Sequence, residues 1–182
     1  MNRDAPQLVA PPESDTGKAT HVTITDTARG AINRRALASA DGRETGGILL
    51  GHAPARPVPA LDVVHAIGPG PRAVRRATVF RRDLRHAQAA ADLAYHTDSS
   101  YWIGDWHTHP TGPPHPSSLD LTSYQSLLAD TELDFAMFLA VIVTPDPVAG
   151  FRRPQLNGWL ISLAGVRATP LRARLPEKDA GQ

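Results

Sequence analysis

Hydrophobic and polar residues alternate with a period of two in several short segments, a pattern typical of half-buried β-strands. Residues 21–25 follow this pattern and are mostly β-branched. Residues 46–52 and 61–67 flank a proline-rich turn at 53–59, so they predict a hairpin. Residues 135–143 are almost continuously apolar, which predicts a central strand covered on both faces. The remaining predicted strands are 101–107, 158–162 and 166–171.

Three other segments carry apolar residues at helical spacing. The first helix is predicted to begin at a cap formed by Asp26 or Thr27 and to end near residue 40. The second covers 83–97, which is rich in alanine. The third covers 118–130 and follows an irregular loop at 110–116.

Length and composition are those of one ordinary globular domain. The chain has 182 residues, of which 41% are hydrophobic. We expect a disordered leader at 1–20, a folded domain at 21–175 and a tail at 176–182. The leader has no apolar segment like that of a secretory signal, and no run approaches the roughly 20 apolar residues that span a bilayer. A cytoplasmic location without a membrane partner is therefore expected.

The absence of cysteine narrows the chemistry of the chain. It excludes disulfides, iron–sulfur clusters and thiol catalysis. It also excludes a nucleobase-deaminase zinc site, which requires cysteine ligands. The formal net charge is only +1, and no nucleic-acid-binding motif accompanies it, so no nucleic-acid partner is expected.

The strongest chemical signal is the spacing of His107, His109, Ser117 and Asp120. Alternate residues of a strand point to the same face, so the two histidines can bind one ion. Ser117 suits a helix cap, which places Asp120 in the first helical turn. Two imidazoles and a carboxylate suit one hydrolytic zinc ion with its fourth position open. Such an ion lowers the pKa of a bound water from about 16 towards about 7.

Hydrolysis also needs a group that accepts a proton, and Glu44 is the best candidate. It precedes the predicted strand 46–52, whereas the other glutamates lie in the leader, a predicted loop and the tail. The alternative is that Glu44 is only a surface carboxylate. Ser117 could stabilise a tetrahedral oxyanion, or Ser117 and Asp120 could form only a capping box. His115 is expected to be an exposed loop residue, because a fourth protein ligand would close the site.

The set formed by Glu44, His107, His109, Ser117 and Asp120 resembles the JAMM motif of JAB/MPN-domain metalloproteases. The resemblance covers roughly residues 24–171. It implies a single α/β domain with a curved mixed β-sheet flanked by helices, in a layer arrangement like that of cytidine deaminases. It also implies that the histidines and the aspartate bind zinc, that Glu44 is the general acid/base and that Ser117 supports the oxyanion.

The same resemblance implies cleavage of isopeptide or peptide bonds that follow the C-terminus of a ubiquitin-like protein. The segments 101–106 and 113–118 resemble a bacterial branch found in operons with activating-like and conjugating-like enzymes, including antiphage operons. The expected partners are a ubiquitin-like protein or its conjugate, together with those enzymes. The alternatives are a non-catalytic MPN scaffold, a protease that trims a sulfur-carrier protein, and a DNA-associated JAB-like protein.

Two further features have competing interpretations. The tail of the ubiquitin-like protein is expected to bind as an added strand along the edge of residues 46–50. Gly46 and Gly47 would allow that close approach, but a bend in the strand would explain them equally well. The arginine cluster at 72–85 is either a solvated surface or a site for an acidic partner.

Overall fold

The computed structural model describes residues 21–53 and 60–174. The predicted leader, the predicted tail and residues 54–59 of the proline-rich turn lie outside the described residues.

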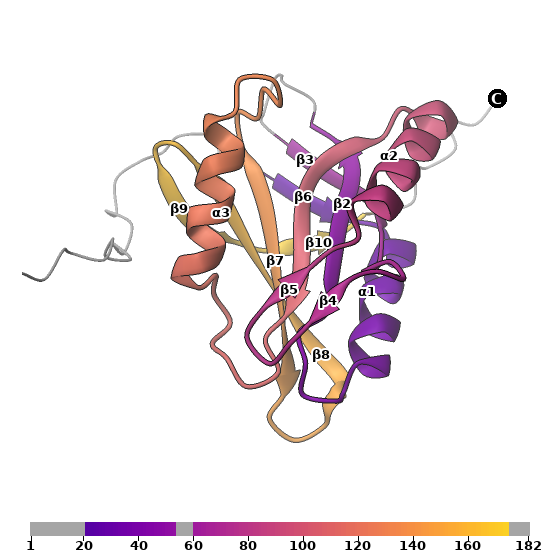
Figure 1. Ribbon diagram of the computed structural model, residues 1–182, viewed down its shortest axis with the longest axis vertical. Coiled ribbons are helices and arrows are strands. Elements are labelled where there is room, and N and C mark those ends of the chain that lie inside the picture. The colour runs from indigo at the N-terminus through magenta and orange to yellow at the C-terminus, as the bar shows by residue number, and fades with distance from the viewer. Residues whose placement is uncertain (1–20, 54–59, 175–182) are drawn as a thin grey trace, which may run out of the picture.

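An eight-stranded mixed sheet runs through the centre of the domain (Figure 1). Its strands in chain order are β1 (His21–Ile24), β2 (Gly46–His52), β3 (Ala60–Ala66), β6 (Tyr101–Thr108), β7 (Phe138–Asp146), β8 (Gly150–Ser162), β9 (Gly165–Thr169) and β10 (Leu171–Ala173). They are arranged in the order β10-β1-β3-β2-β6-β7-β8-β9. The helices are α1 (Asp26–Ala38), α2 (Leu84–Asp98) and α3 (Ser118–Ala129). A separate two-stranded sheet pairs β4 (Val74–Arg75) with β5 (Phe80–Arg81).

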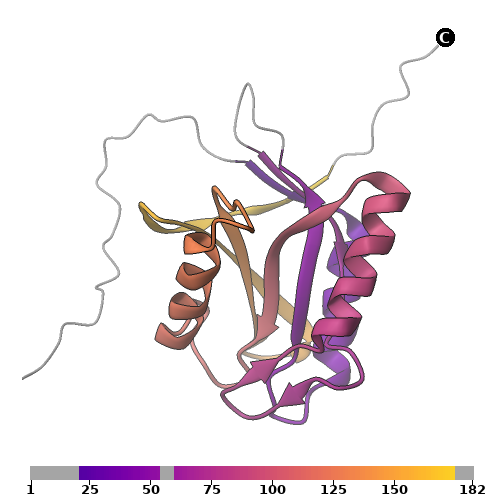
Figure 2. The ribbon, with the colours of Figure 1, turned by 45° about the horizontal axis from the view of Figure 1, so that its top comes forward.

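Helices cover both faces of the sheet (Figure 2). The side chain of Leu49 lies in the core beneath α1, whereas its neighbours Ile48 and Leu50 lie beneath α2. Along β7, Leu139 likewise belongs to the core of α1 and Phe138 to that of α3. This alternation follows from strand geometry and explains why β2 and β7 are apolar almost throughout. The expected α/β class, curved mixed sheet and 46–52/61–67 hairpin are confirmed.

The sheet is rolled so strongly that its two edges approach each other. Strands β9 and β10 stand at opposite ends of the strand order, yet only Pro170 separates them in the chain. The prediction of one strand over 166–171 was therefore wrong. Pro170 has no N–H to donate to a ladder, so the strand ends there. The chain then leaves β8 and pairs Leu171 with Val22 of β1.

Three local predictions are also corrected. Thr25, not Asp26 or Thr27, caps α1, because its side-chain oxygen accepts a hydrogen bond from the N–H of Ala28. The strand predicted at 158–162 extends back to Gly150, since it pairs with β7 along its polar first half as well. The pair β4–β5 lies within 68–82, where no structure was predicted. Within residues 21–53 and 60–174, none of the helices combines the length and the apolar character that a membrane-spanning helix requires.

The end of α2 is tied to the sheet through Asp98. Its carboxylate accepts a hydrogen bond from the N–H of Ser100 at 2.9 Å and contacts Nε2 of His65 on β3 at 2.7 Å. Hydrogen bonds from Ser100 and His65 lower the pKa of Asp98 to about 2. The contact between Asp98 and His65 therefore joins α2 to β3 through a carboxylate that loses its proton at an unusually low pH.

Candidate metal centre

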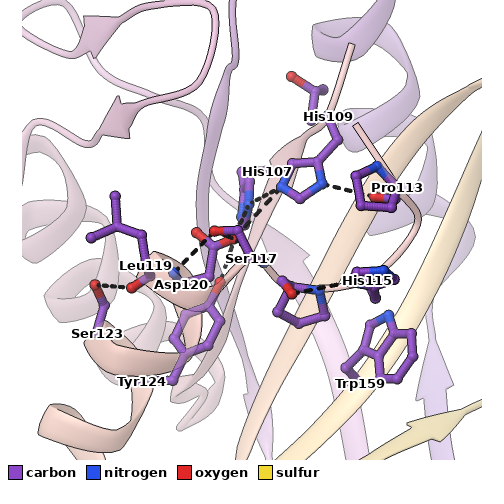
Figure 3. Close-up of polar contacts among 12 residues, drawn as sticks. His107, His109, Pro113, His115, Ser117, Leu119, Asp120, Ser123, Tyr124 and Trp159 are labelled. Carbon is purple, nitrogen blue, oxygen red and sulfur yellow. Dashed lines mark hydrogen bonds and ion pairs between the residues drawn. The ribbon is translucent and has the colours of Figure 1, made fainter. Parts of the chain in front are cut away.

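The two histidines lie at the end of a central strand. His107 on β6 is paired with Gly46 of β2 and with Ile142 of β7. His109 follows the strand, and its N–H donates to the carbonyl of Val143 at 2.9 Å. Both side chains are buried, and both rings extend to the same side of the sheet (Figure 3). The predicted convergence of i and i+2 side chains is thus realised.

Asp120 reaches the same point from the first turn of α3. Ser117 is the N-cap, and together with Asp120 it forms a capping box. One oxygen of Asp120 (Oδ2) accepts hydrogen bonds from the N–H of Ser117 at 2.7 Å and from its hydroxyl at 2.6 Å. The capping interpretation is therefore correct, but it accompanies the convergence on the histidines and does not replace it.

The loop between His109 and Ser117 is held against the sheet by β8. The indole N–H of Trp159 donates to the carbonyl of Pro114 at 2.9 Å, and His115 stacks edge-on against the same indole. His115 is half-buried there, so the expectation of an exposed residue was only partly correct. It does not belong to the group of ligand atoms, as expected.

Side-chain donors of His107, His109 and Asp120 fit a small tetrahedral metal ion. The two Nε2 atoms are 2.9 Å apart, and they lie 3.4 and 3.6 Å from Oδ2 of Asp120 (Figure 3). Zinc–ligand bonds of about 2.0–2.1 Å place tetrahedral ligand atoms about 3.3 Å from one another. One nitrogen or oxygen atom from each residue lies within 4.8 Å of the others. The donor types and their spacing suit zinc.

The far side of each imidazole has its own partner. Nδ1 of His109 donates to the carbonyl of Pro113 at 2.8 Å, which leaves the Nε2 lone pair facing Asp120. Nδ1 of His107 lies 3.5 Å from the hydroxyl of Tyr124 on α3. Burial and the negative charge of Asp105 raise the pKa of Tyr124 well above its usual value, so its hydroxyl keeps its proton.

Charges at the centre are strongly coupled. Burial alone would raise the pKa of Asp120, but contacts with His107 and His109 outweigh burial and hold the pKa far below its usual value. Burial would lower the pKa of His109, but the hydrogen bonds to Asp120 and Pro113 and the negative charges of Asp120 and Glu44 together outweigh burial and raise the pKa. A negative carboxylate thus faces two imidazoles. A metal cation that binds between them would displace protons from these ligand residues.

Glu44 lies beside this group, just before β2. Its N–H donates to the carbonyl of Arg76 at 2.8 Å, and its own carbonyl accepts from Nε of Arg75 at 3.2 Å. Burial raises the pKa of Glu44, although the charges of His107 and His109 oppose the increase. Glu44 is half-buried and lies close enough to His107 and His109 for their charges to affect its pKa.

A cavity of about 280 Å³ opens in front of these groups. Glu44, His107 and Asp120 line it together with residues 78–82 of the β4–β5 hairpin. Residues 119, 123 and 124 of α3 form the opposite wall. The cavity therefore lies between the hairpin and α3.

The expectation of an added strand along residues 46–50 was wrong. Strand β2 is paired with β6 on one side and β3 on the other, so it has no free edge over Leu49 and Leu50. Gly47 is needed by the fold itself, because a Cβ there would lie 1.9 Å from the carbonyl oxygen of Ile67. Gly47 therefore allows the backbone of β2 to pack closely against the backbone of Ile67.

The arginine cluster at 72–85 serves more than one purpose. Arg75 pairs with Asp41 at 2.8 Å, and Arg82 forms a close ion pair with the buried carboxylate of Asp105 on β6. The indole of Trp102 also contacts both members of that pair. The other four, Arg72, Arg76, Arg81 and Arg85, are exposed.

Tyr124 and Asp105 had no role in the interpretation of the sequence, and Arg82 appeared there only as a member of the arginine cluster, although all three line the cavity. Tyr124 lies one helical turn after Asp120, and Asp105 lies two strand positions before His107. Periodicity alone was therefore enough to place Tyr124 and Asp105 on the faces of the metal ligands. Arg82 comes from a segment without regular pattern, so its contact with Asp105 had no such signal.

Comparison with known proteins agrees with this geometry. The family described as prokaryotic homologs of the JAB domain matches residues 28–155. Two similar curated proteins, from Enterobacter hormaechei and Escherichia coli, are each named CD-NTase/cGAS isopeptidase. The first is 31% identical over 59% of this chain and 59% of its own length. The second is 35% identical over 49% of this chain and 56% of its own length.

A third relative, from Vibrio cholerae, has the same name and is 28% identical over 62% of this chain and 70% of its own length. The matched part thus spans little more than half of the first two relatives. The solution structure of a protein from Desulfitobacterium hafniense has the same fold, with a TM-score of 0.62 and 19% identity over 87% of this chain and 97% of that one. Since the family matches well over half of the chain, this protein is a member of the prokaryotic JAB-domain family.

Proposed function

We propose that this protein is a zinc-dependent isopeptidase that releases a ubiquitin-like protein from a conjugate carrying a CD-NTase-type enzyme. The observation that carries the proposal is the convergence of His107, His109 and Asp120 beside Glu44 at one cavity. The names of the three bacterial relatives support the class of conjugate. The chain would act in the cytoplasm, alongside the activating-like and conjugating-like enzymes that build the conjugate.

Each polar group of the site has a distinct role in this proposal. His107, His109 and Asp120 hold one zinc ion, which when bound supplies Lewis acidity and lowers the pKa of water at the site. Glu44 accepts the proton of the attacking water and delivers it to the leaving lysine amine. Its raised pKa suits this exchange, because a weakly basic carboxylate would not retain the proton between the two steps.

Ser117 is proposed to donate a hydrogen bond to the tetrahedral oxyanion. Its hydroxyl donates to Asp120 in the structure, so an oxyanion would compete with that carboxylate for the proton. The cap itself does not depend on this proton, because the Ser117 oxygen accepts from the N–H of Asp120 at 3.2 Å and the N–H of Ser117 also binds Asp120. The hydroxyl can therefore turn to the substrate while α3 stays capped.

The shape of the cavity supports a route by which an extended tail would reach the centre. Strand β5 at its rim is paired with β4 on one side only, within the part of the chain that the structure describes. A tail can add to this short sheet through backbone hydrogen bonds and bring its last carbonyl to Glu44 and His107. Leu119 on the opposite wall is 60% exposed and offers an apolar contact to the tail.

Trimming of a sulfur-carrier protein would use the same chemistry, but the names of the relatives favour a conjugate. A non-catalytic scaffold would not need donors at tetrahedral spacing next to a carboxylate of raised pKa. These two alternatives differ from the proposal in the products they predict.

The test is a cleavage assay with purified components. The substrates are an isopeptide-linked CD-NTase conjugate from the same genome and a linear fusion that extends the ubiquitin-like protein by several residues. We expect the wild-type protein to release the modifier with an intact C-terminus, measured by intact mass spectrometry. Glu44→Gln should be inactive, and Asp92→Ala, which changes an exposed carboxylate on α2, should retain activity. Cleavage of the fusion alone would replace deconjugation by precursor processing, and no cleavage by the zinc-loaded protein would reject the proposal.

A further inference from the structure

The two histidines of the candidate centre differ in what holds them. Nδ1 of His109 is bound to a backbone carbonyl, which only accepts a hydrogen bond and therefore fixes the proton on that nitrogen. Nδ1 of His107 meets a side-chain hydroxyl, that of Tyr124, at 3.5 Å. A hydroxyl can accept or donate, so it fixes the imidazole only if its own proton is directed elsewhere.

The surroundings of Tyr124 supply that direction. The ring is only 4% exposed and lies against Phe138 with centroids 5.0 Å apart, so packing holds the ring in place. Asp105 is buried on the same strand face as His107 and is held by its ion pair with Arg82. Both Asp105 and Tyr124 line the cavity beside His107. The negative charge of Asp105 acts on Tyr124 more strongly than those of Asp120 and Glu44, which favours a hydroxyl proton directed towards Asp105 and a lone pair directed towards His107.

We infer that Tyr124 is the positioning residue of His107. Its hydroxyl accepts the Nδ1–H of the imidazole, so that Nε2 carries the lone pair that faces His109 and Asp120. Asp120, a ligand residue, and Tyr124, which positions the ligand His107, thus lie one turn apart on α3. This inference rests on the proposed function, because it assumes that the three donors bind zinc.

The variant Tyr124→Phe removes only the hydroxyl and keeps the ring against Phe138. Loss of an outer partner of a metal-bound histidine typically weakens metal binding by about 10-fold to 100-fold. We expect Tyr124→Phe to bind zinc about 10-fold more weakly than wild type in competition with a chromophoric chelator. Tyr101→Phe removes a hydroxyl that accepts from the N–H of Ala53, far along β6 from the centre, and should bind zinc like wild type.

A second measurement separates positioning from a general loss of structure. Long-range ¹⁵N–¹H NMR of the zinc-free protein, recorded at a pH at which the imidazoles are neutral, reports which nitrogen of His107 carries the proton. We expect the Nδ1–H form in wild type and a mixture of both forms in Tyr124→Phe, with His109 unchanged. Equal zinc affinity and an unchanged His107 signal in Tyr124→Phe would overturn the inference while leaving the proposed function intact. A wild-type protein that binds no zinc would instead reject the proposed function, and the inference with it.

Discussion

Replacing Asp120 with alanine is expected to abolish the stabilisation of the protein by zinc while leaving the domain folded. Asp120 supplies one of three donors that lie within 4.8 Å of one another, so its loss leaves two imidazoles. A ligand present at 100 times its Kd stabilises a folded protein by about 2.7 kcal/mol. In a domain of this size, 1 kcal/mol changes Tm by about 2–4 °C. Zinc should therefore raise Tm by about 5–11 °C in wild type and by almost nothing in Asp120→Ala.

The measured quantity must be the zinc-induced difference, not Tm itself. Asp120 also completes the capping box of α3, and loss of such a cap costs about 1 kcal/mol in the metal-free protein. Scanning calorimetry with and without zinc separates the two effects. Glu44→Gln and the surface control Asp92→Ala should keep the full increase. A retained increase in Asp120→Ala would show that Asp120 is not a zinc ligand, and a lost increase in Glu44→Gln would show that Glu44 takes part in metal binding.

Three further predictions follow from individual residues. Glu44→Gln should reduce turnover by about 10²-fold to 10⁴-fold. Wild-type activity should fall as the pH drops through the raised pKa of Glu44, because the base must be ionised before it accepts a proton. A flat pH–rate profile would contradict this role. Gly47→Ala should destabilise the protein severely, since its Cβ would lie 1.9 Å from the Ile67 oxygen, whereas Gly30→Ala in α1 meets only a flexible side chain and should be tolerated or mildly stabilising in denaturant titrations. The folded-state pKa of Asp98 is about 2, below the unfolded value of 3.8, so its stabilising effect is complete above about pH 4 and is lost as the pH falls towards 2. Asp98→Asn should remove this contribution to the loss of stability in acid. An identical pH dependence of stability in both proteins would show that the contact is not formed.

Local spacing was sufficient to predict the core of the candidate site. His107 and His109 are alternate residues of one strand and Asp120 lies in the first turn of the next helix, so short-range geometry determines where all three point. Glu44 is different, because its approach to His107 depends on the pairing of β2 with β6. Its role was predicted from the family motif, and no spacing rule would have placed it there.

The parts that sequence patterns missed are those created by tertiary contacts. The strands β4 and β5 have two residues each, too short for alternation to be detected, yet they hold the backbone of Glu44 and form one wall of the cavity. The expectation of a free edge at 46–50 was wrong because a hydrophobic pattern indicates which face of a strand is buried and not which strands lie beside it. Pro170 was evidence in the sequence against one strand over 166–171, because proline has no N–H to donate to a strand ladder.

The position of β10 has a consequence for the order in which the domain forms. Strand β1 pairs with β3 and with β10, so Val22 finds its partner Leu171 only after almost the whole domain has been synthesised. The residues that converge at the candidate centre are complete by residue 120, long before the core around α1 can be enclosed. Pairing between such distant residues is slow because a long loop must close first. The last step of folding is thus expected to be the docking of residues 171–173, at the far end of the chain from the strand that they secure.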